Sequence, residues 1–271
     1  MDDRFKLLNL WVTSVLPKLD YHISELFGDA SFRRYYRVHC NNDSYIVMDA
    51  PPDKLNCQPF ITTAALFKKL GVHVPEICAS DLANGFLLLS DFGDQQYLGA
   101  LNINNADTLY SDALQTLSLF QTHTSDAKQQ LPDYNLALLT RELEIFREWV
   151  LQHYLSLSLN DDEQLALERV FKLLCNNALE QPRVLVHRDY HSRNLMITPK
   201  HNPGVLDFQD AVNGPLTYDL VSLLRDCYIA WPEDKVTHWV LTYYTHLRSQ
   251  NCLQPFDEKT FLRWFDLTGL Q

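Results

Sequence analysis

Polar side chains are concentrated in the segment HRDYHSRN, residues 187–194, which is followed directly by the apolar residues LMI. It contains His187, Asp189 and Asn194, and Asp207 follows near the end of the short apolar run GVLDF. A carboxylate in such a loop can orient a hydroxyl group and accept its proton, and an Asn/Asp pair suits a hard cation such as Mg²⁺. The pattern indicates phosphoryl transfer to a hydroxyl group, with Asp189 as the base and Asn194 and Asp207 as metal ligands.

Short strands must position these side chains. RVLVH covers residues 183–187, NLMIT covers 194–198 and GVLDF covers 204–208, and a tight turn from 199 to 203 joins the last two. These two runs can pair as a hairpin. Such a hairpin would place Asn194 and Asp207 at the same end of its two strands.

The first third of the chain has the pattern of a small α+β unit. Apolar residues at helical spacing predict a helix over residues 5–16, and a second helix over about 57–70 stops at Gly71. Two runs rich in Tyr, Val and Ile form a hairpin around residues 41–43, and FLLLS at 86–90 suits a central strand.

Beyond residue 92 the pattern is helical. Apolar positions at three- and four-residue spacing predict helices over 107–122, 135–155, 161–179, 217–229, 235–248 and 258–270. We therefore predict an α+β chain with two lobes, a small β-rich N-lobe over residues 1–92 that covers the nucleotide and a larger helical C-lobe over 93–271 that carries the catalytic and substrate-binding residues.

Composition restricts the possible partners. A hydrophobic share of 46% in 271 residues indicates a globular chain, and its net charge of −11 repels nucleic acids and anionic membrane surfaces. The six cysteines form no C-x-x-C pair, so the sequence indicates neither a zinc site nor a disulfide framework. No stretch approaches the roughly 20 apolar residues of a membrane span. We expect a cytoplasmic protein with no nucleic-acid or membrane partner, and the sequence gives no oligomeric state.

The motif His187-x-Asp189-x4-Asn194, followed by Asp207-Phe208, resembles the catalytic loop and metal motif of the protein-kinase-like superfamily. The segment NGPLTYDLVSLLRD is similar to the G-x-P-x-x-D-L segment of its aminoglycoside and choline phosphotransferase branch. The resemblance implies a two-lobed kinase-like fold that uses ATP and Mg²⁺. It also implies that His187 and Asp219 support the catalytic loop without touching the substrate.

A narrower resemblance extends over nearly all of the chain. The segments VLVHRDYHSRNLM, GVLDFQDAVNGPLTYDLVSLLRDCY and GDASFRRYYRV are similar to those of the bacterial anomeric kinases for N-acetylmuramate and N-acetylglucosamine, which recycle cell-wall sugars. This implies ATP-dependent phosphorylation of the C1 hydroxyl of a small amino sugar to the sugar 1-phosphate. Chains of this family continue past the residue where this one ends, so we expect a C-terminal truncation.

The expected nucleotide site departs from the protein-kinase pattern. Where those enzymes place a strand lysine for the phosphates, YIVMDAPP has Met48 and Asp49. We expect an arginine from GDASFRRYYR, Arg33 or Arg34, to meet the phosphates, with Ser31 in the turn that covers them. Leu89 and Asp91, at the end of the FLLLS run, complete the expected nucleotide contacts.

His191, Arg193 and Asp210 are the expected substrate-binding residues. Each has a plainer interpretation, because the first two can be solvated loop residues and Asp210 can cap the following segment. Asn194 and Asp207 taken singly could be turn formers, and only their joint spacing with the other motif residues favours a metal site. We expect the Tyr and Trp side chains of residues 217–240 to belong to the core.

Three other functions remain open. HRDYHSRN resembles the H-R-D-L-A-A-R-N loop of protein tyrosine kinases, but the strand lysine is missing, DFQ replaces D-F-G, and no A-P-E segment follows. An aminoglycoside or choline kinase would act on another small hydroxyl substrate. A nucleotide-binding pseudokinase scaffold is the last alternative, and the retention of Asp189, Asn194 and Asp207 argues against it.

Overall fold

A computed structural model describes residues 3–17, 20–26, 32–41, 43–122, 131–251, 253 and 255–270. The N-terminal part is built on a five-stranded antiparallel sheet of order β1-β2-β3-β5-β4. Its strands are β1 (Tyr21–Leu26), β2 (Arg34–Cys40), β3 (Asp43–Asp49), β4 (Ile77–Asp81) and β5 (Phe86–Ser90). The predicted hairpin around residues 41–43 is the β2–β3 pair.

Side chains of the sheet alternate between two apolar clusters. Helix α1 (Asp3–Val15) buries Leu8 and Val12 in one cluster with Val47 and Leu88. The intervening residues Met48, Leu87 and Leu89 belong to the other cluster, which contains α2 (Gln58–Lys69). Because successive side chains in a strand point to opposite faces, α1 and α2 pack on opposite faces of the sheet.

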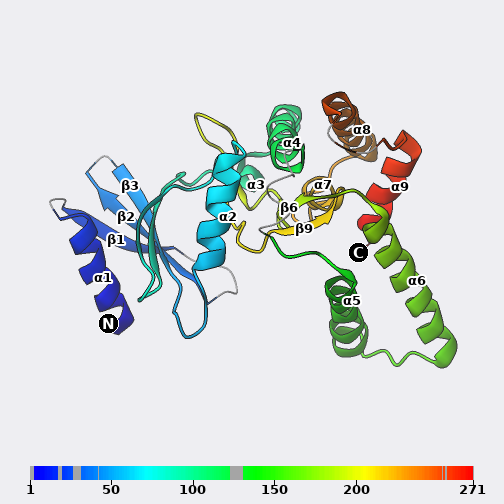
Figure 1. The fold of residues 1–271 in the computed structure, drawn as a ribbon, viewed down its shortest axis with the longest axis horizontal. Coiled ribbons are helices and arrows are strands. Elements are labelled where there is room, and N and C mark those ends of the chain that lie inside the picture. The colour runs from blue at the N-terminus through cyan, green and yellow to red at the C-terminus, as the bar shows by residue number, and fades with distance from the viewer. Residues whose placement is uncertain are drawn as a thin grey trace.

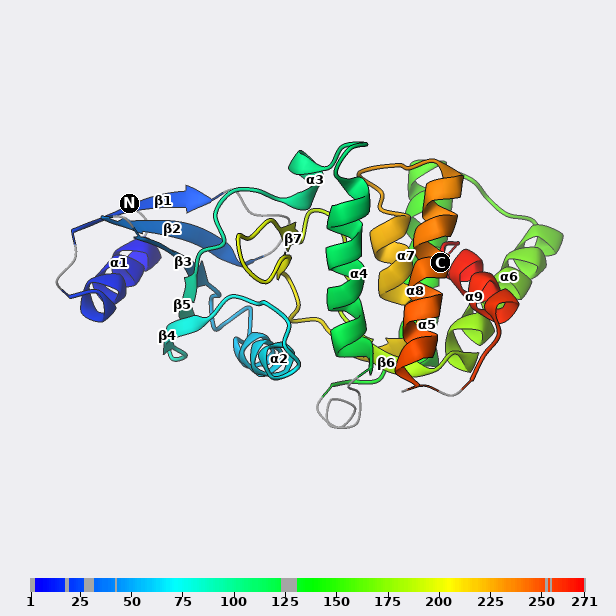
Figure 2. The same ribbon diagram turned by 90° about the horizontal axis from the view of Figure 1, so that it is seen from above.

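Helix α2 joins the sheet to the helical part of the chain, between which it lies in both views (Figures 1 and 2). The Phe60 ring centroid lies 4.8 Å from that of Phe208, and the Phe67 ring lies 5.1 Å from Phe120 and 6.0 Å from His187. The helix therefore packs directly against His187 and Phe208, which flank the predicted catalytic loop.

The remaining elements form the helical part and the small strands inside it. The helices are α3 (Tyr97–Ala100), α4 (Ala106–Thr122), α5 (Leu136–Ile145), the π-helix η1 (Phe146–Tyr154), α6 (Asp161–Glu180), α7 (Tyr218–Leu224), α8 (Glu233–Gln250) and α9 (Glu258–Thr268). The strands are β6 (Arg183–Val186), β7 (Leu195–Met196), β8 (Gly204–Val205) and β9 (Val212–Pro215), paired as β6–β9 and β7–β8.

The sequence-based element predictions hold for most helices and miss three strands. β1 and β4 were not predicted because both are edge strands of mixed polarity, and β9 has the sequence VNGP, whose Gly and Pro indicate a turn. The single helix predicted over 135–155 is wrong in part, since α5 gives way to the π-helix η1 at Phe146. Every residue of η1 is at least partly exposed, so the π-helix buries none of its side chains in the core.

The division into lobes at residue 92 stays a proposal. The chain leaves the sheet at Ser90, and Phe92 packs its ring so closely on Gly204 of β8 that a Cβ added there would lie 2.5 Å from it. The loop after the sheet is thus fixed to the hairpin of the catalytic segment. Within the ranges described, no helix is long and apolar enough to span a membrane.

Candidate active site

The predicted catalytic segment, residues 187–207, begins where β6 ends and includes the β7–β8 hairpin. Leu195 pairs with Val205 and Met196 with Gly204, and the amide of Leu206 donates to the carbonyl of Asn194 at 2.9 Å. This pairing places Asn194 opposite Leu206, directly before Asp207. The predicted hairpin and the placement of both residues at one end of it are therefore present.

Hydrogen bonds within the loop hold the side chain of Asn194 against the backbone of Asp189. The amide nitrogen Nδ2 of Asn194 donates to the Asp189 carbonyl at 3.0 Å. The backbone amide of His191 donates to the same carbonyl at 3.0 Å, and that of Asn194 donates to the His191 carbonyl at 2.9 Å. Because the nitrogen of the Asn194 side chain faces the loop, its oxygen is directed away from it.

Asp189 is half-buried, with acidic and basic groups on either side. Burial raises the pKa of its carboxyl group, and the negative charges of Asp207 and Asp210 add to this, while His191 and Arg188 lower it. A raised pKa makes the carboxylate a stronger proton acceptor once it is ionised. The same interactions show that the Asp189 carboxylate lies within electrostatic reach of both Asp207 and His191.

Asp207 is exposed and has a left-handed backbone, with φ of +61°. The side-chain amide of Gln209 donates to its Oδ1 at 2.8 Å and lies 3.4 Å from Oδ2 of Asp210. One amide group therefore holds two carboxylates beside each other. The sequence did not single out Gln209, because nothing local distinguishes it from a turn residue.

The oxygen donors fit magnesium. A single carboxylate and an amide oxygen are a hard, incomplete set, and Mg²⁺ usually completes its shell with water and substrate phosphates. Among the residues described, no group of three or more His, Cys, Asp and Glu side chains could hold a metal ion. The predicted pair of Asn194 and Asp207 therefore suits an ion that arrives with a nucleotide better than a transition metal.

Asp219 is fully buried and accepts two backbone hydrogen bonds from the start of the loop. The amides of His187 and Arg188 donate to its two carboxylate oxygens at 2.6 Å and 2.9 Å. Burial raises the pKa of Asp219 to about 7, and the two amides oppose this shift. This is the geometry that the resemblance implies for a carboxylate supporting the loop.

His187 is also fully buried, and its tautomer follows from its partners. The Asp189 amide donates to Nδ1 at 3.2 Å, so Nδ1 is an acceptor and the proton is on Nε2, which lies 2.9 Å from the Leu206 carbonyl. Burial lowers the pKa of His187 to about 3. The imidazole is neutral and connects the loop to the residue before Asp207.

Of the predicted nucleotide residues, Arg34 is the first residue of β2 and Arg33 lies directly before it. The Arg34 guanidinium donates to the buried Asp49 carboxylate at 2.9 Å, and Arg4 of α1 donates to the same carboxylate, so Arg34 is on the α1 face. Tyr35 is on the opposite face, near both Arg33 and Asp207, whose charges act on it while burial raises its pKa to about 12. The charges of Arg33 and Asp207 thus both act on Tyr35, whereas Arg34 is held by Asp49 on the α1 face. Ser31 lies outside the described residues.

Leu89 and Asp91 are at the junction between the sheet and the helical part. Leu89 is a buried residue inside β5, paired with Ile46 and Ile77. Asp91 forms an ion pair with Arg37 at 2.6 Å, and its side chain is 3% exposed. Only the backbone of this segment is therefore suited to contact a nucleotide.

On the other side of Asp189, the loop meets the segment between α7 and α8. The ring of His191 lies 5.4 Å from that of Tyr228, and the guanidinium of Arg193 lies 4.9 Å from the centre of the same ring. Tyr228 is 46% exposed, which corrects the expectation that the aromatic residues of 217–240 are all core. Trp239, at 3% exposure, does belong to the core.

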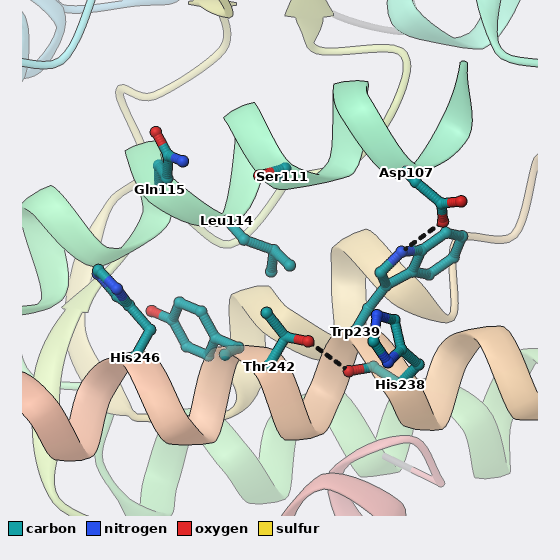
Figure 3. Close-up of a pocket in the computed structure, with 9 residues that line it drawn as sticks. Asp107, Ser111, Leu114, Gln115, His238, Trp239, Thr242 and His246 are labelled. Atoms are coloured by element: carbon teal, nitrogen blue, oxygen red, sulfur yellow. Dashed lines mark hydrogen bonds between the residues drawn. The ribbon is translucent and has the colours of Figure 1, made fainter. Parts of the chain in front are cut away.

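A separate hollow of about 270 Å³ lies between α4 and α8 (Figure 3). Its lining residues are Asp107, Ser111, Leu114, Gln115, His238, Trp239, Thr242, Tyr243 and His246. None of them belongs to the catalytic loop or to the predicted metal pair. The indole nitrogen of Trp239 donates to Asp107 at 3.0 Å, which joins the two helices there.

Comparisons with known proteins agree with this arrangement. The chain is 45% identical to an N-acetylmuramate/N-acetylglucosamine kinase of Pseudomonas aeruginosa over 100% of its own length and 82% of that protein. A protein of the same name from Neisseria meningitidis is 37% identical over 100% of this chain and 81% of its own.

The fold is shared with more distant structures. Aminoglycoside 2'-phosphotransferase-IIIa, solved with GDP, matches with a TM-score of 0.68 and 17% identity over 99% of this chain and 88% of that one. A choline kinase from Streptococcus pneumoniae matches with a TM-score of 0.59 and 14% identity over 100% of both chains. The predicted two-lobed kinase-like fold is therefore confirmed. Residues 22–256 match the profile of the phosphotransferase enzyme family, to which this chain belongs.

Proposed function

We propose that this chain transfers the γ-phosphoryl group of ATP to the anomeric C1 hydroxyl of N-acetylmuramate or N-acetylglucosamine. The position of Asp189 carries the proposal. The charges of Asp207 and His191 act on its carboxyl group, and its backbone carbonyl accepts a hydrogen bond from Asn194. His191 and Arg193 of the same loop contact Tyr228. The names of the similar kinases of P. aeruginosa and N. meningitidis support the choice of acceptor.

The proposed reaction is a direct phosphoryl transfer. Asp189 accepts the proton of the anomeric hydroxyl, whose oxygen bonds to the γ-phosphorus while the bond from that phosphorus to the β,γ-bridging oxygen of ATP breaks. The products are the sugar 1-phosphate, ADP and a proton. An anomeric hydroxyl is more acidic than an ordinary alcohol, so positioning and charge stabilisation can supply most of the catalysis.

Asn194 and Asp207 would hold Mg²⁺, which when bound neutralises charge on the transferring phosphates. Arg33, directly before β2, and Tyr35 within it would face the nucleotide, because the charges of Arg33 and Asp207 both act on Tyr35. Asp219 and His187 act only through the loop backbone, by fixing the direction of the Asp189 carboxylate. Because the reaction consumes ATP, a cytoplasmic location stays our prediction.

Phosphorus NMR of the purified protein with Mg-ATP and each sugar tests the proposal. We expect an anomeric phosphate resonance with wild type and a loss of turnover of at least about a hundredfold in Asp189→Asn, the range for removing a general base. ATP binding by the variant, measured by calorimetry, should be retained because Asn has the same shape. If wild type binds ATP but phosphorylates neither sugar, the acceptor assignment is wrong. If Asp189→Asn keeps its turnover, Asp189 is not the base.

A further inference from the structure

The segment 225–232, which carries Tyr228, is fixed to the rest of the molecule at two points. At its start, Oδ2 of Asp226 accepts a hydrogen bond from the Ser192 amide at 3.0 Å, and Oδ1 accepts one from the Tyr228 amide at 2.9 Å. The Ser192 hydroxyl also bonds to this carboxylate, which is buried. Asp226 therefore ties Tyr228 directly to the catalytic loop.

The second fixed point is Trp231. Its indole nitrogen donates to the hydroxyl of Tyr110 at 2.8 Å, and its ring packs 5.8 Å from Trp239, the residue at the edge of the α4–α8 hollow in Figure 3. Two anchors on either side of Tyr228 leave the intervening backbone little freedom. The exposed ring of Tyr228 is thus held in a fixed place beside the loop.

Arg193 is positioned by this ring. Its guanidinium lies over the ring face at 4.9 Å, and Nη1 lies 3.4 Å from the Tyr228 hydroxyl. A guanidinium that stacks on an aromatic ring keeps its N–H groups in one plane, directed outward from the edge, where they match the two oxygens of a carboxylate.

The side of the site on which Arg193 lies indicates what it meets. Tyr35 of the sheet is close to Asp207, so the nucleotide phosphates belong on that side of Asp189. His191, a neighbour of the Asp189 carboxylate, and Arg193 instead contact the segment between α7 and α8. Arg193 is therefore on the acceptor side.

An acidic acceptor needs such a cation. The negative charges of Asp207 and Asp210 act on Asp189 here, and the whole chain has a net charge of −11. N-Acetylmuramate carries a carboxylate on its lactyl ether, whereas N-acetylglucosamine is neutral. Without a nearby cation, the site would repel the acidic sugar.

We propose that Arg193, held on the ring of Tyr228, binds the carboxylate of an acidic amino sugar and so sets the preference of the site for N-acetylmuramate over N-acetylglucosamine. The proposal rests on the amino-sugar kinase function proposed above. In it Arg193 touches the substrate, Tyr228 is a positioning residue, and Asp226 fixes Tyr228.

The experiment measures turnover and calorimetric binding of both sugars for wild type, Arg193→Gln and Tyr228→Leu. We expect Arg193→Gln to raise the KM and Kd for N-acetylmuramate roughly tenfold or more, the effect of losing one hydrogen bond between charged groups. The KM and Kd for N-acetylglucosamine and for ATP should change less than about twofold. Tyr228→Leu should also raise the KM and Kd for N-acetylmuramate relative to those for N-acetylglucosamine. Tyr228→Phe, which keeps the ring, should resemble wild type.

Arg147→Gln is the matched control. Arg147 also stacks on an aromatic ring, at 5.2 Å from the centre of Phe171, but on η1, far along the chain from the loop. The Arg147→Gln variant loses one positive charge outside the site, so both sugars should bind this variant as they bind wild type. Thermal unfolding of each variant shows whether a loss of binding comes from a loss of structure.

The outcomes separate the two proposals. If Arg193→Gln weakens both sugars equally, or raises the KM for ATP instead, the role of Arg193 is overturned while the kinase function stands. If wild type turns over neither sugar but binds the acidic one through Arg193, the inference holds and the reaction fails. If neither sugar binds wild type, both proposals are overturned.

Discussion

Nη2 of Arg188 lies 2.6 Å from Oε1 of Glu142, so the residue directly before Asp189 is tied to helix α5. Arg188 has a left-handed backbone, with φ of +80°, a conformation that costs a non-glycine residue roughly 1–2 kcal/mol. The conformation is maintained from two directions, by Asp219 at the backbone amide and by Glu142 at the side chain. The direction of the proposed base therefore depends on a helix more than 40 residues earlier in the chain.

Glu142→Gln tests this dependence. The side chains of Arg188 and Glu142 are 28% and 22% exposed, so their charge-assisted bond is largely shielded from water. We expect the free energy of unfolding to fall by about 1–3 kcal/mol, the range for a hydrogen bond between charged groups, and kcat to fall with it. Urea denaturation and steady-state kinetics measure the two effects. Glu168→Gln, which removes an exposed partner of Arg147, should cost less than about 1 kcal/mol. Equal losses of stability in the two variants would show that the Arg188–Glu142 bond contributes no more than an exposed ion pair.

Arg33 and Arg34 should behave differently when each is replaced by alanine. Arg34 shares the buried Asp49 carboxylate with Arg4 on the α1 face, so Arg34→Ala should lower stability by about 1 kcal/mol and leave the KM for ATP nearly unchanged. The charges of Arg33 and Asp207 both act on Tyr35, so we expect Arg33→Ala to raise the KM for ATP by roughly tenfold. If the KM for ATP rises only in Arg34→Ala, then Arg34 and not Arg33 meets the nucleotide.

Asp207→Asn should change the dependence of the reaction on magnesium. Asparagine tolerates the left-handed backbone at this position, so the variant should fold. Loss of the charged ligand should raise the Mg²⁺ concentration needed for half-maximal turnover and lower kcat by about a hundredfold or more. Asp210→Asn is the comparison, because Asp210 shares the Gln209 amide but is the expected sugar contact. It should act on the KM for sugar, and an Mg²⁺ response like that of Asp207→Asn would place the ion between the two carboxylates.

The local part of the site could be predicted because it is contiguous. Asp189 and Asn194 are in one loop, and the hairpin that returns to Asp207 spans a dozen residues, so strand pairing alone brings them together. The same reasoning places Arg34 at the start of a strand that can face the nucleotide or α1. It does not say which face meets the nucleotide, because that depends on the long-range contact of α1 with Asp49.

The residues that support the loop could not be predicted, because they reach it through contacts between distant parts of the chain. Asp226 reaches Ser192 across 34 positions, and Glu142 reaches Arg188 across 46, and no local pattern connects either pair. Helical spacing predicts a core position for Tyr228, but α7 ends at Leu224 and α8 begins at Glu233. Its exposure follows from where these two helices end.

The buried imidazole of His187 predicts a loss of stability in acid. Its pKa is lowered to about 3 in the folded chain, against about 6.5 when unfolded, so between these values the unfolded chain binds more protons. The free energy of unfolding therefore falls as the pH drops below 6.5, and at pH 5 this group alone has lowered it by about 2 kcal/mol. Asp219 acts in the opposite sense, because its pKa is raised to about 7 and protonation favours the folded chain as the pH falls.

Comparison with His187→Gln separates the two groups, since both proteins keep Asp219. The variant should be less stable at pH 7.5, because glutamine does not reproduce the bonds to Leu206 and Asp189. It should nevertheless lose about 2 kcal/mol less than wild type between pH 7.5 and pH 5, because glutamine does not titrate. Urea denaturation at the two pH values gives this difference. Equal losses in wild type and variant would mean that His187 takes up its proton at about the same pH in the folded and unfolded chains, and the lowered pKa of the buried imidazole would be wrong.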